Sequence, residues 1–179
     1  MATAVSRPRP ADIWLYYERC QVALAALRNE AVIKSIAATG GGPFFQLTSI
    51  EYEDALSDMR DELDDQVTLA LVASFEASFR IDFEQRVRRR LKDGVSREFR
   101  TIARQYGQRV KFEDILDIWK QASGRPHRFR KLVQLLNYRH WLAHGRYWVD
   151  KSGQEFAPLI AWQIIEAVRA ELPRDFSAL

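Results

Sequence analysis

Residues 44–93 contain neither glycine nor proline, and no other feature of the sequence restricts the fold as strongly. Along most of this stretch, apolar residues recur at three- and four-residue steps, as they do on one face of an α-helix. The members of this series are Tyr52, Leu56, Met59, Leu63, Val67, Leu71, Phe75 and Phe79. One or two long helices are therefore predicted. Residues 69–73 are apolar on every side, which favours a helix packed inside a bundle over a coiled-coil strand.

Glycine and proline residues divide the rest of the chain into further predicted helices. These helices cover Pro10 to about Gly40, 96–106, 111–122, about 126–144 and about 157–173. Residues 1–9 show no periodic pattern, so a flexible tail is predicted there. Residues 10–179 are predicted to form one all-α domain, a single bundle of five or six helices.

The composition is that of a soluble globular protein, with 47% hydrophobic and 28% charged residues. No apolar run approaches the roughly 20 residues that cross a bilayer, and the N-terminus lacks the apolar core of a signal peptide. We therefore expect no membrane association and a cytoplasmic location. Cys20 is the only cysteine, so it cannot form an intramolecular disulfide, and it is predicted to be a small buried apolar residue.

Charge is distributed unevenly along the chain, although the net charge is only +3. Residues 51–65 include eight acidic residues and one arginine, whereas residues 80–111 include eleven basic and four acidic residues. Residues 121–149 contain no acidic residue. Such blocks are commonly solvated helix faces, but the two basic blocks together also fit an RNA-binding surface. The acidic block would attract a basic partner or repel nucleic acid from one side.

The predicted helix at 126–144 places one charge among apolar residues. On a helical wheel, Arg139 lies in the middle of an arc formed by Leu132, Leu135, Leu136, Leu142 and Ala143. A guanidinium keeps its proton, so at such a position it pairs with an anion, reaches water or lines a cleft. Glu76 is similarly isolated on the apolar stripe of the long helix. An ion pair between Glu76 and Arg139 is therefore predicted, and Glu76→Ala is expected to cost roughly 3–5 kcal/mol.

The run Arg139-His-Trp-Leu-Ala-His144-Gly closely resembles the Arg-x4-6-His signature of HEPN domains. These are small all-helical proteins that include many metal-independent endoribonucleases of toxin–antitoxin and antiphage systems. The polar residue after the arginine, the Ala-His-Gly ending and the late position in the chain all support the resemblance. It implies that Arg139 and His144 are catalytic, with Asn137 and His140 in supporting roles. It also implies cleavage of RNA to a 2′,3′-cyclic phosphate without a metal or other cofactor.

The residue types suit this chemistry, because histidine exchanges protons near neutral pH and arginine offers a planar fork of donors to phosphate. Five residues of helix, however, separate two side chains by about 140° and ~7.5 Å, so one helix does not bring Arg139 and His144 together. The resemblance implies a homodimer in which both residues of both subunits line one cleft. Trp141, Tyr147 and Trp148 are then expected near the interface or on the RNA bases, with Arg146 as a further RNA-binding residue.

Two other functions remain open from the sequence. The first is a non-catalytic HEPN-like module that binds protein or nucleic acid within a defence or signalling complex. The second is a metal site, since His140 and His144 are spaced i, i+4, although no acidic third ligand lies nearby in the sequence. RNA, a second copy of the chain, and an antitoxin or defence-complex protein are the expected partners.

Overall fold

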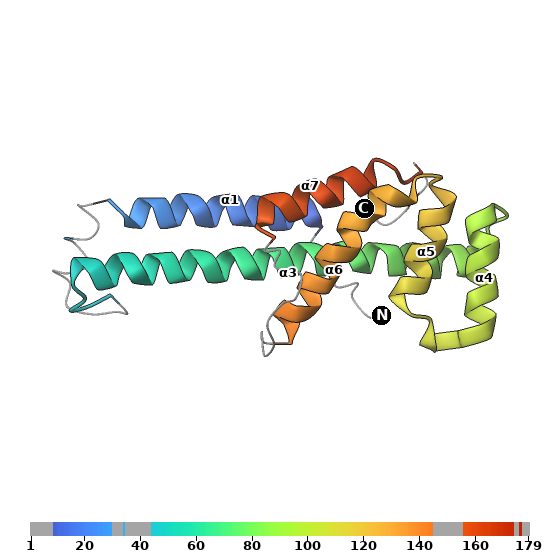
Figure 1. The fold of residues 1–179 in the computed structure, drawn as a ribbon, viewed down its shortest axis with the longest axis horizontal. Coiled ribbons are helices and arrows are strands. Elements are labelled where there is room, and N and C mark those ends of the chain that lie inside the picture. The colour runs from blue at the N-terminus through green and yellow to red at the C-terminus, as the bar shows by residue number, and fades with distance from the viewer. Residues whose placement is uncertain (1–8, 30–33, 35–43, 145–155, 174–175, 177–179) are drawn as a thin grey trace, which may run out of the picture.

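The computed structural model describes residues 9–29, 34, 44–144, 156–173 and 176, and within them all regular secondary structure is helical (Figure 1). The prediction of an all-α domain is confirmed. The described residues form six α-helices: α1 (Pro10–Leu27), α3 (Ser49–Arg89), α4 (Gly94–Tyr106), α5 (Phe112–Ala122), α6 (Arg130–Ala143) and α7 (Pro158–Arg169). Two 3-10 turns join them, η1 (Gly107–Arg109) and η2 (Pro126–Phe129).

Helix α3 is the axis of the molecule, and α1, α4, α5, α6 and α7 all pack against it (Figure 1). Its 41 residues make it roughly 60 Å long. Thr48 caps its start, since the hydroxyl accepts a hydrogen bond from the Glu51 amide and the Glu51 carboxylate accepts one from the Thr48 amide. The helix ends at Arg90, which adopts a left-handed conformation with φ 52°. Most of the stretch without glycine or proline, residues 49–89, therefore forms one helix.

The core surrounds the C-terminal half of α3, where α5, α6 and α7 cover it. Its largest fully buried side chains include Phe75, Phe79, Phe99, Phe129, Leu132, Leu135 and Ile165. Several of the rings meet edge to face, such as Phe75 with Phe79 at 5.1 Å between centroids. The N-terminal half of α3 extends beyond this bundle and runs antiparallel to α1 (Figure 1). The molecule thus has a bundle end and a two-helix end.

The predicted core stripe of α3 is partly wrong. Met59 is 44% exposed, Leu63 is only partly buried, and Glu76 is not the only charged residue on the core side of the helix. Asp82 and Arg86 lie deeper, with exposed fractions of 0% and 2%. The reason is that α3 has different neighbours along its length, because α4 and α5 cover another side of its C-terminal end. A single helical wheel drawn for all of α3 cannot show that the buried face differs between the two ends of the helix.

Arg86 fixes the corner between α3 and α4. Its Nε donates to both carboxylate oxygens of Asp82, at 3.0 and 2.9 Å, and its guanidinium lies 5.0 Å from the centre of the Trp119 ring. Its Nη1 is 3.4 Å from Oδ1 of Asp93, the residue that caps α4. Burial alone would raise the pKa of Asp93, but hydrogen bonds from Ser96 and the charge of Arg86 outweigh it and lower that pKa. This cluster is a structural element of the core.

Two further expectations can be compared with the described residues. None of the described helices is both long enough and apolar enough to cross a membrane. The predicted tail lies outside the described residues except for Arg9, which caps α1 and pairs with Asp12 at 3.1 Å. The predicted first helix does not run unbroken to Gly40, because α1 ends at Leu27 and Arg28 and Asn29 are not helical. Beyond Asn29, Lys34 is the one residue before Phe44 that the structure describes, and it is helical.

Candidate functional site

Helix α6 carries the motif and is held against the core by its N-terminal turns. Leu132 and Leu135 are fully buried, and Tyr138 is 5% exposed with its hydroxyl donating to Asp65 on α3 at 3.2 Å. The predicted apolar arc does not extend to the end of the helix, because Leu142 is only partly buried and Ala143 is exposed. Sequence reasoning missed Tyr138, which occupies the core position instead. The motif end of α6 therefore lies at the surface while its start is anchored.

The predicted ion pair between Arg139 and Glu76 is confirmed. Nη1 of Arg139 lies 3.5 Å from Oε2 of Glu76, and the two side chains are 32% and 15% exposed. The pair is not exclusive, however, because Arg80 donates to Oε1 of Glu76 from Nε at 3.1 Å and from Nη2 at 3.0 Å. Arg80 thus holds Glu76 more closely than Arg139 does. Arg80 lies four residues after Glu76, a spacing that places both on one helix face, but this second cation was not predicted.

Arg139 keeps hydrogen-bonding capacity after pairing with Glu76. Its Nε is buried and has no hydrogen-bond partner among the described residues. A guanidinium has five N–H donors, and a buried donor without a partner costs about 1–3 kcal/mol. Because this Nε is enclosed by protein, an anion would accept from it only after the side chain moves toward the surface. Arg139 is therefore the one motif residue at the boundary between core and surface with an unused donor.

His140 and His144 lie at the exposed end of α6. Their ring centroids are 4.2 Å apart with the planes tilted by 62°, and the His144 amide donates to the His140 carbonyl at 3.2 Å. His144 is the C-terminal cap of the helix. Asn137 is also exposed, one turn earlier. The structure thus brings the two histidines together, while Arg139 points toward α3.

Of the remaining predicted site residues, Arg146, Tyr147 and Trp148 lie outside the described residues. Trp141 is partly buried against the core, with its ring centroid 5.6 Å from that of Tyr138. Within the described part of the chain, no three side chains of His, Cys, Asp or Glu are grouped closely enough to hold a metal ion. The two histidines therefore lack a third ligand of these types in that part of the protein.

A basic hollow lies at the other end of α6 and was not predicted. It has a volume of about 540 Å³ between η2, the start of α6 and α7. Its lining includes His127, Arg128, Arg130, Lys131 and Gln134, with Gln163 of α7. The sequence indicated a basic segment, but only the position of α7 shows that these side chains surround a concave surface.

Comparison with protein families, curated proteins and solved structures finds no match for this chain.

Proposed function

We propose that the protein is a metal-independent endoribonuclease of the HEPN type, acting as a toxin of a toxin–antitoxin or antiphage system. The observation that supports this most is the state of Arg139, a cation held 3.5 Å from Glu76 with an unpartnered buried Nε, one residue from a pair of exposed histidines. A donor to phosphate and a group that exchanges protons are what metal-free RNA cleavage requires.

In the proposed reaction, His144 accepts the proton of the 2′-hydroxyl while the 2′-oxygen attacks phosphorus. Arg139 donates hydrogen bonds to the two non-bridging oxygens, where negative charge develops. The bond from phosphorus to the 5′-oxygen breaks, and that oxygen takes a proton from a second imidazole. The products are a 2′,3′-cyclic phosphate and a 5′-hydroxyl.

The second imidazole and the convergence of Arg139 with His144 both require a second subunit in this proposal. On one α6 the two side chains point in different directions, since Arg139 reaches α3 and His144 is exposed at the helix end. A two-fold dimer through the end of α6 would bring two copies of each into one cleft. His140, beside His144, and Asn137 would then position the RNA. Arg146 and Tyr147 are proposed to contact RNA or the partner subunit.

A non-catalytic binding module is the second candidate function. The contact between Arg139 and Glu76 favours it, because that contact gives the arginine a structural role without any substrate. In this case Arg139 and the histidines would form a phosphate-facing patch within a larger defence complex.

The test is an RNA cleavage assay in EDTA with a single-stranded substrate. We expect wild type to leave 2′,3′-cyclic phosphate ends and to sediment as a dimer. His144→Ala and Arg139→Ala should each reduce the rate by about 10²–10⁴, with a smaller loss for His140→Ala. Arg80→Ala is the matched control, because it removes the other cation on Glu76 and should keep most of the activity.

Two results would overturn the enzyme proposal. One is RNA binding without cleavage, which would favour the binding module. The other is cleavage that needs Mg²⁺ and survives His144→Ala. If a strict monomer cleaved RNA, the enzyme proposal would stand, and only the proposed cleft between two subunits would be contradicted.

A further inference from the structure

Polar contacts join the two helices at the two-helix end of the molecule, in addition to the buried side chains of Tyr52 and Leu56. The hydroxyl of Tyr17 donates to Asp64 at 2.9 Å, and that of Tyr52 donates to the Leu27 carbonyl at 2.8 Å. Arg28 pairs with Glu53 at 3.3 Å. In α1, only Pro10 and Ile13 are buried. Much of the apolar surface of this end is therefore left in contact with solvent.

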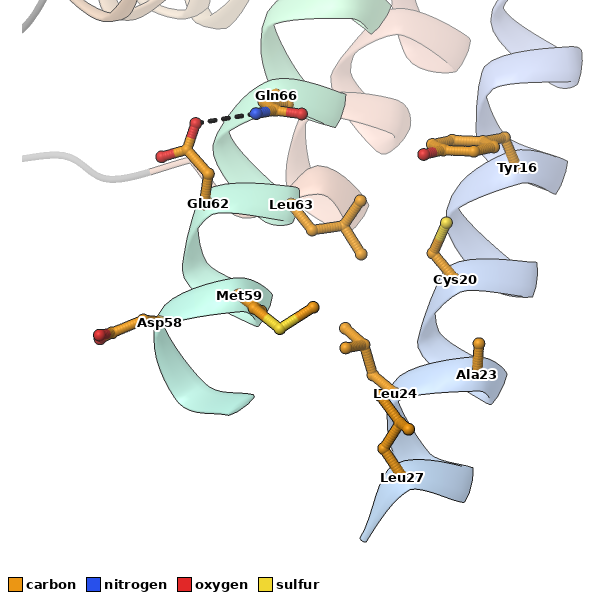
Figure 2. Close-up of a pocket in the computed structure, with 10 residues that line it drawn as sticks. All are labelled: Tyr16, Cys20, Ala23, Leu24, Leu27, Asp58, Met59, Glu62, Leu63 and Gln66. Carbon is orange, nitrogen blue, oxygen red and sulfur yellow. Dashed lines mark hydrogen bonds between the residues drawn. The ribbon is translucent and has the colours of Figure 1, made fainter. Parts of the chain in front are cut away.

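That apolar surface forms a groove between α1 and α3. A hollow of about 580 Å³ lies between the helices, with Leu24 and Cys20 of α1 facing Met59 and Leu63 of α3 (Figure 2). Tyr16 lies at one end of the groove in this view. Its side chain is 59% exposed, and that of Met59 is 44% exposed. Cys20, predicted to be buried, is only partly buried here. The groove is thus open to solvent along an apolar floor.

The groove continues toward the bundle. A second hollow of about 350 Å³ shares Tyr16, Leu63 and Gln66 with the first and extends to Ala70. From Asp58 to Ala70 the rise along α3 is roughly 18 Å, which is between three and four helical turns. A helix laid into the groove would place its apolar side chains at i, i+3 or i+4 and i+7 over this length.

One rim of the groove is acidic. Asp58 and Glu62 line it from α3 and point away from α1 (Figure 2). They belong to residues 51–65, in which eight acidic residues accompany one arginine. A second copy of this chain, bound in a two-fold arrangement through the same groove, would place this rim against itself. Charge therefore favours an occupant of opposite sign.

We propose that the groove between α1 and α3 is a docking site for an amphipathic helix of another protein, with an apolar stripe flanked by lysine or arginine. The apolar floor would provide most of the contact area, and Met59 is a side chain that adapts to different apolar surfaces. The acidic rim would select basic flanks and set the orientation of the helix. This site is separate from the motif at the end of α6, so it does not depend on the proposed nuclease activity.

The sole cysteine provides a direct readout of binding, because Cys20 lines the groove. The probe is a synthetic helix of about 18 residues with leucine at helical spacing and lysine at the flanks, compared with the same peptide carrying glutamate flanks. We expect the lysine peptide to slow modification of Cys20 by a thiol reagent about tenfold or more at saturation. The glutamate peptide should bind at least about tenfold more weakly, and salt should reduce the difference between them.

Two matched variants locate the binding surface. Met59→Lys places a charge in the groove and should weaken the lysine peptide by about tenfold or more, whereas Val22→Lys should not. Val22 is a suitable control because it lies on α1, is 71% exposed and does not line the groove. Replacing both Asp58 and Glu62 by lysine should remove the preference for basic flanks. Thermal unfolding of each variant confirms that the fold is kept, as expected for exposed positions.

Three outcomes would overturn the proposal. The first is that neither peptide protects Cys20. The second is that both peptides bind equally, or that Val22→Lys weakens binding as much as Met59→Lys. The third is self-association of the peptide-free protein that Met59→Lys abolishes, which would identify a second copy of the chain as the occupant.

Discussion

Arg86 and Arg139 both face the core of this protein, and their hydrogen-bonding groups are paired to different degrees. Arg86 is 2% exposed and contacts Asp82, Asp93 and the face of Trp119. Arg139 is 32% exposed, reaches one oxygen of Glu76 at 3.5 Å and keeps a buried Nε without a described partner. The difference separates an arginine whose charge is fully matched within the fold from one whose donors are not all used.

The physical reason lies in desolvation. A charge removed from water is tolerated only when its partner and hydrogen bonds replace the lost hydration. The Asp82–Arg86 pair meets this condition, since the carboxylate is fully buried and both oxygens accept from Nε. Arg139 does not meet it, because Glu76 is shared with Arg80. A phosphate would supply the acceptors that the protein does not.

The largest expected effect follows from removing Arg86. Arg86→Ala should lower the free energy of unfolding by about 3–5 kcal/mol, because it leaves the Asp82 carboxylate buried without its partner. Urea unfolding would measure this loss. Replacing the pair together, with Asp82→Leu and Arg86→Met, should recover much of it. A loss below about 1 kcal/mol for Arg86→Ala would mean that the two arginines do not differ in the way described.

A smaller loss is expected at the other arginine. Glu76→Ala should cost about 1–2 kcal/mol, less than the sequence alone predicted, because Glu76 is 15% exposed and Arg139 still reaches water. Arg80→Ala is the control, and it should cost only a few tenths of a kcal/mol as a partly exposed i, i+4 pair. If Glu76→Ala were as damaging as Arg86→Ala, Arg139 would be a structural residue, and the case for a ligand there would weaken.

The contrast also shows what the sequence was able to predict. The pair of Glu76 and Arg139 was found because each is an isolated charge on an apolar stripe. Asp82 and Arg86 were missed, although their i, i+4 spacing next to Phe79 and Phe83 was a usable signal. Their burial depends on α4 and α5, which cover that side of α3. Local spacing identifies a helix face, but not which neighbour covers it.

Helix boundaries were predicted to within a few residues at Gly94, Gly107 and Pro158, but not everywhere. The helix predicted from about residue 126 begins at Arg130, after the turn η2, and α1 ends at Leu27 rather than near Gly40. Gly94 begins α4 and Gly107 ends it with a positive φ of 58°, while Pro158 begins α7. The groove and the basic hollow were not predicted, because each forms between helices distant in sequence. The direction of Arg139 relative to His144 was predicted from helix geometry alone. Whether a second subunit brings them together remains a prediction.

The smallest expected effect concerns Asp93, the outer partner of Arg86. Its side chain is 42% exposed and its pKa is lowered, since the hydrogen bonds from Ser96 and the charge of Arg86 outweigh the effect of burial. A carboxylate with a lowered pKa in the folded state stabilises the fold above its unfolded pKa, and this contribution is lost as the pH falls through the folded value. The contribution of Asp93 is therefore lost at pH values below its ordinary pKa of 3.8.

Asp93→Asn isolates the charge, because asparagine caps a helix about as well as aspartate. At pH 7 we expect it to lower the free energy of unfolding by less than about 1 kcal/mol, as for a solvent-screened ion pair. The difference from wild type should shrink as the pH falls into the window below 3.8, where the wild-type carboxylate becomes protonated. A difference that stays constant with pH would mean that Arg86 is stabilised by Asp82 alone, so that the buried pair needs no outer partner.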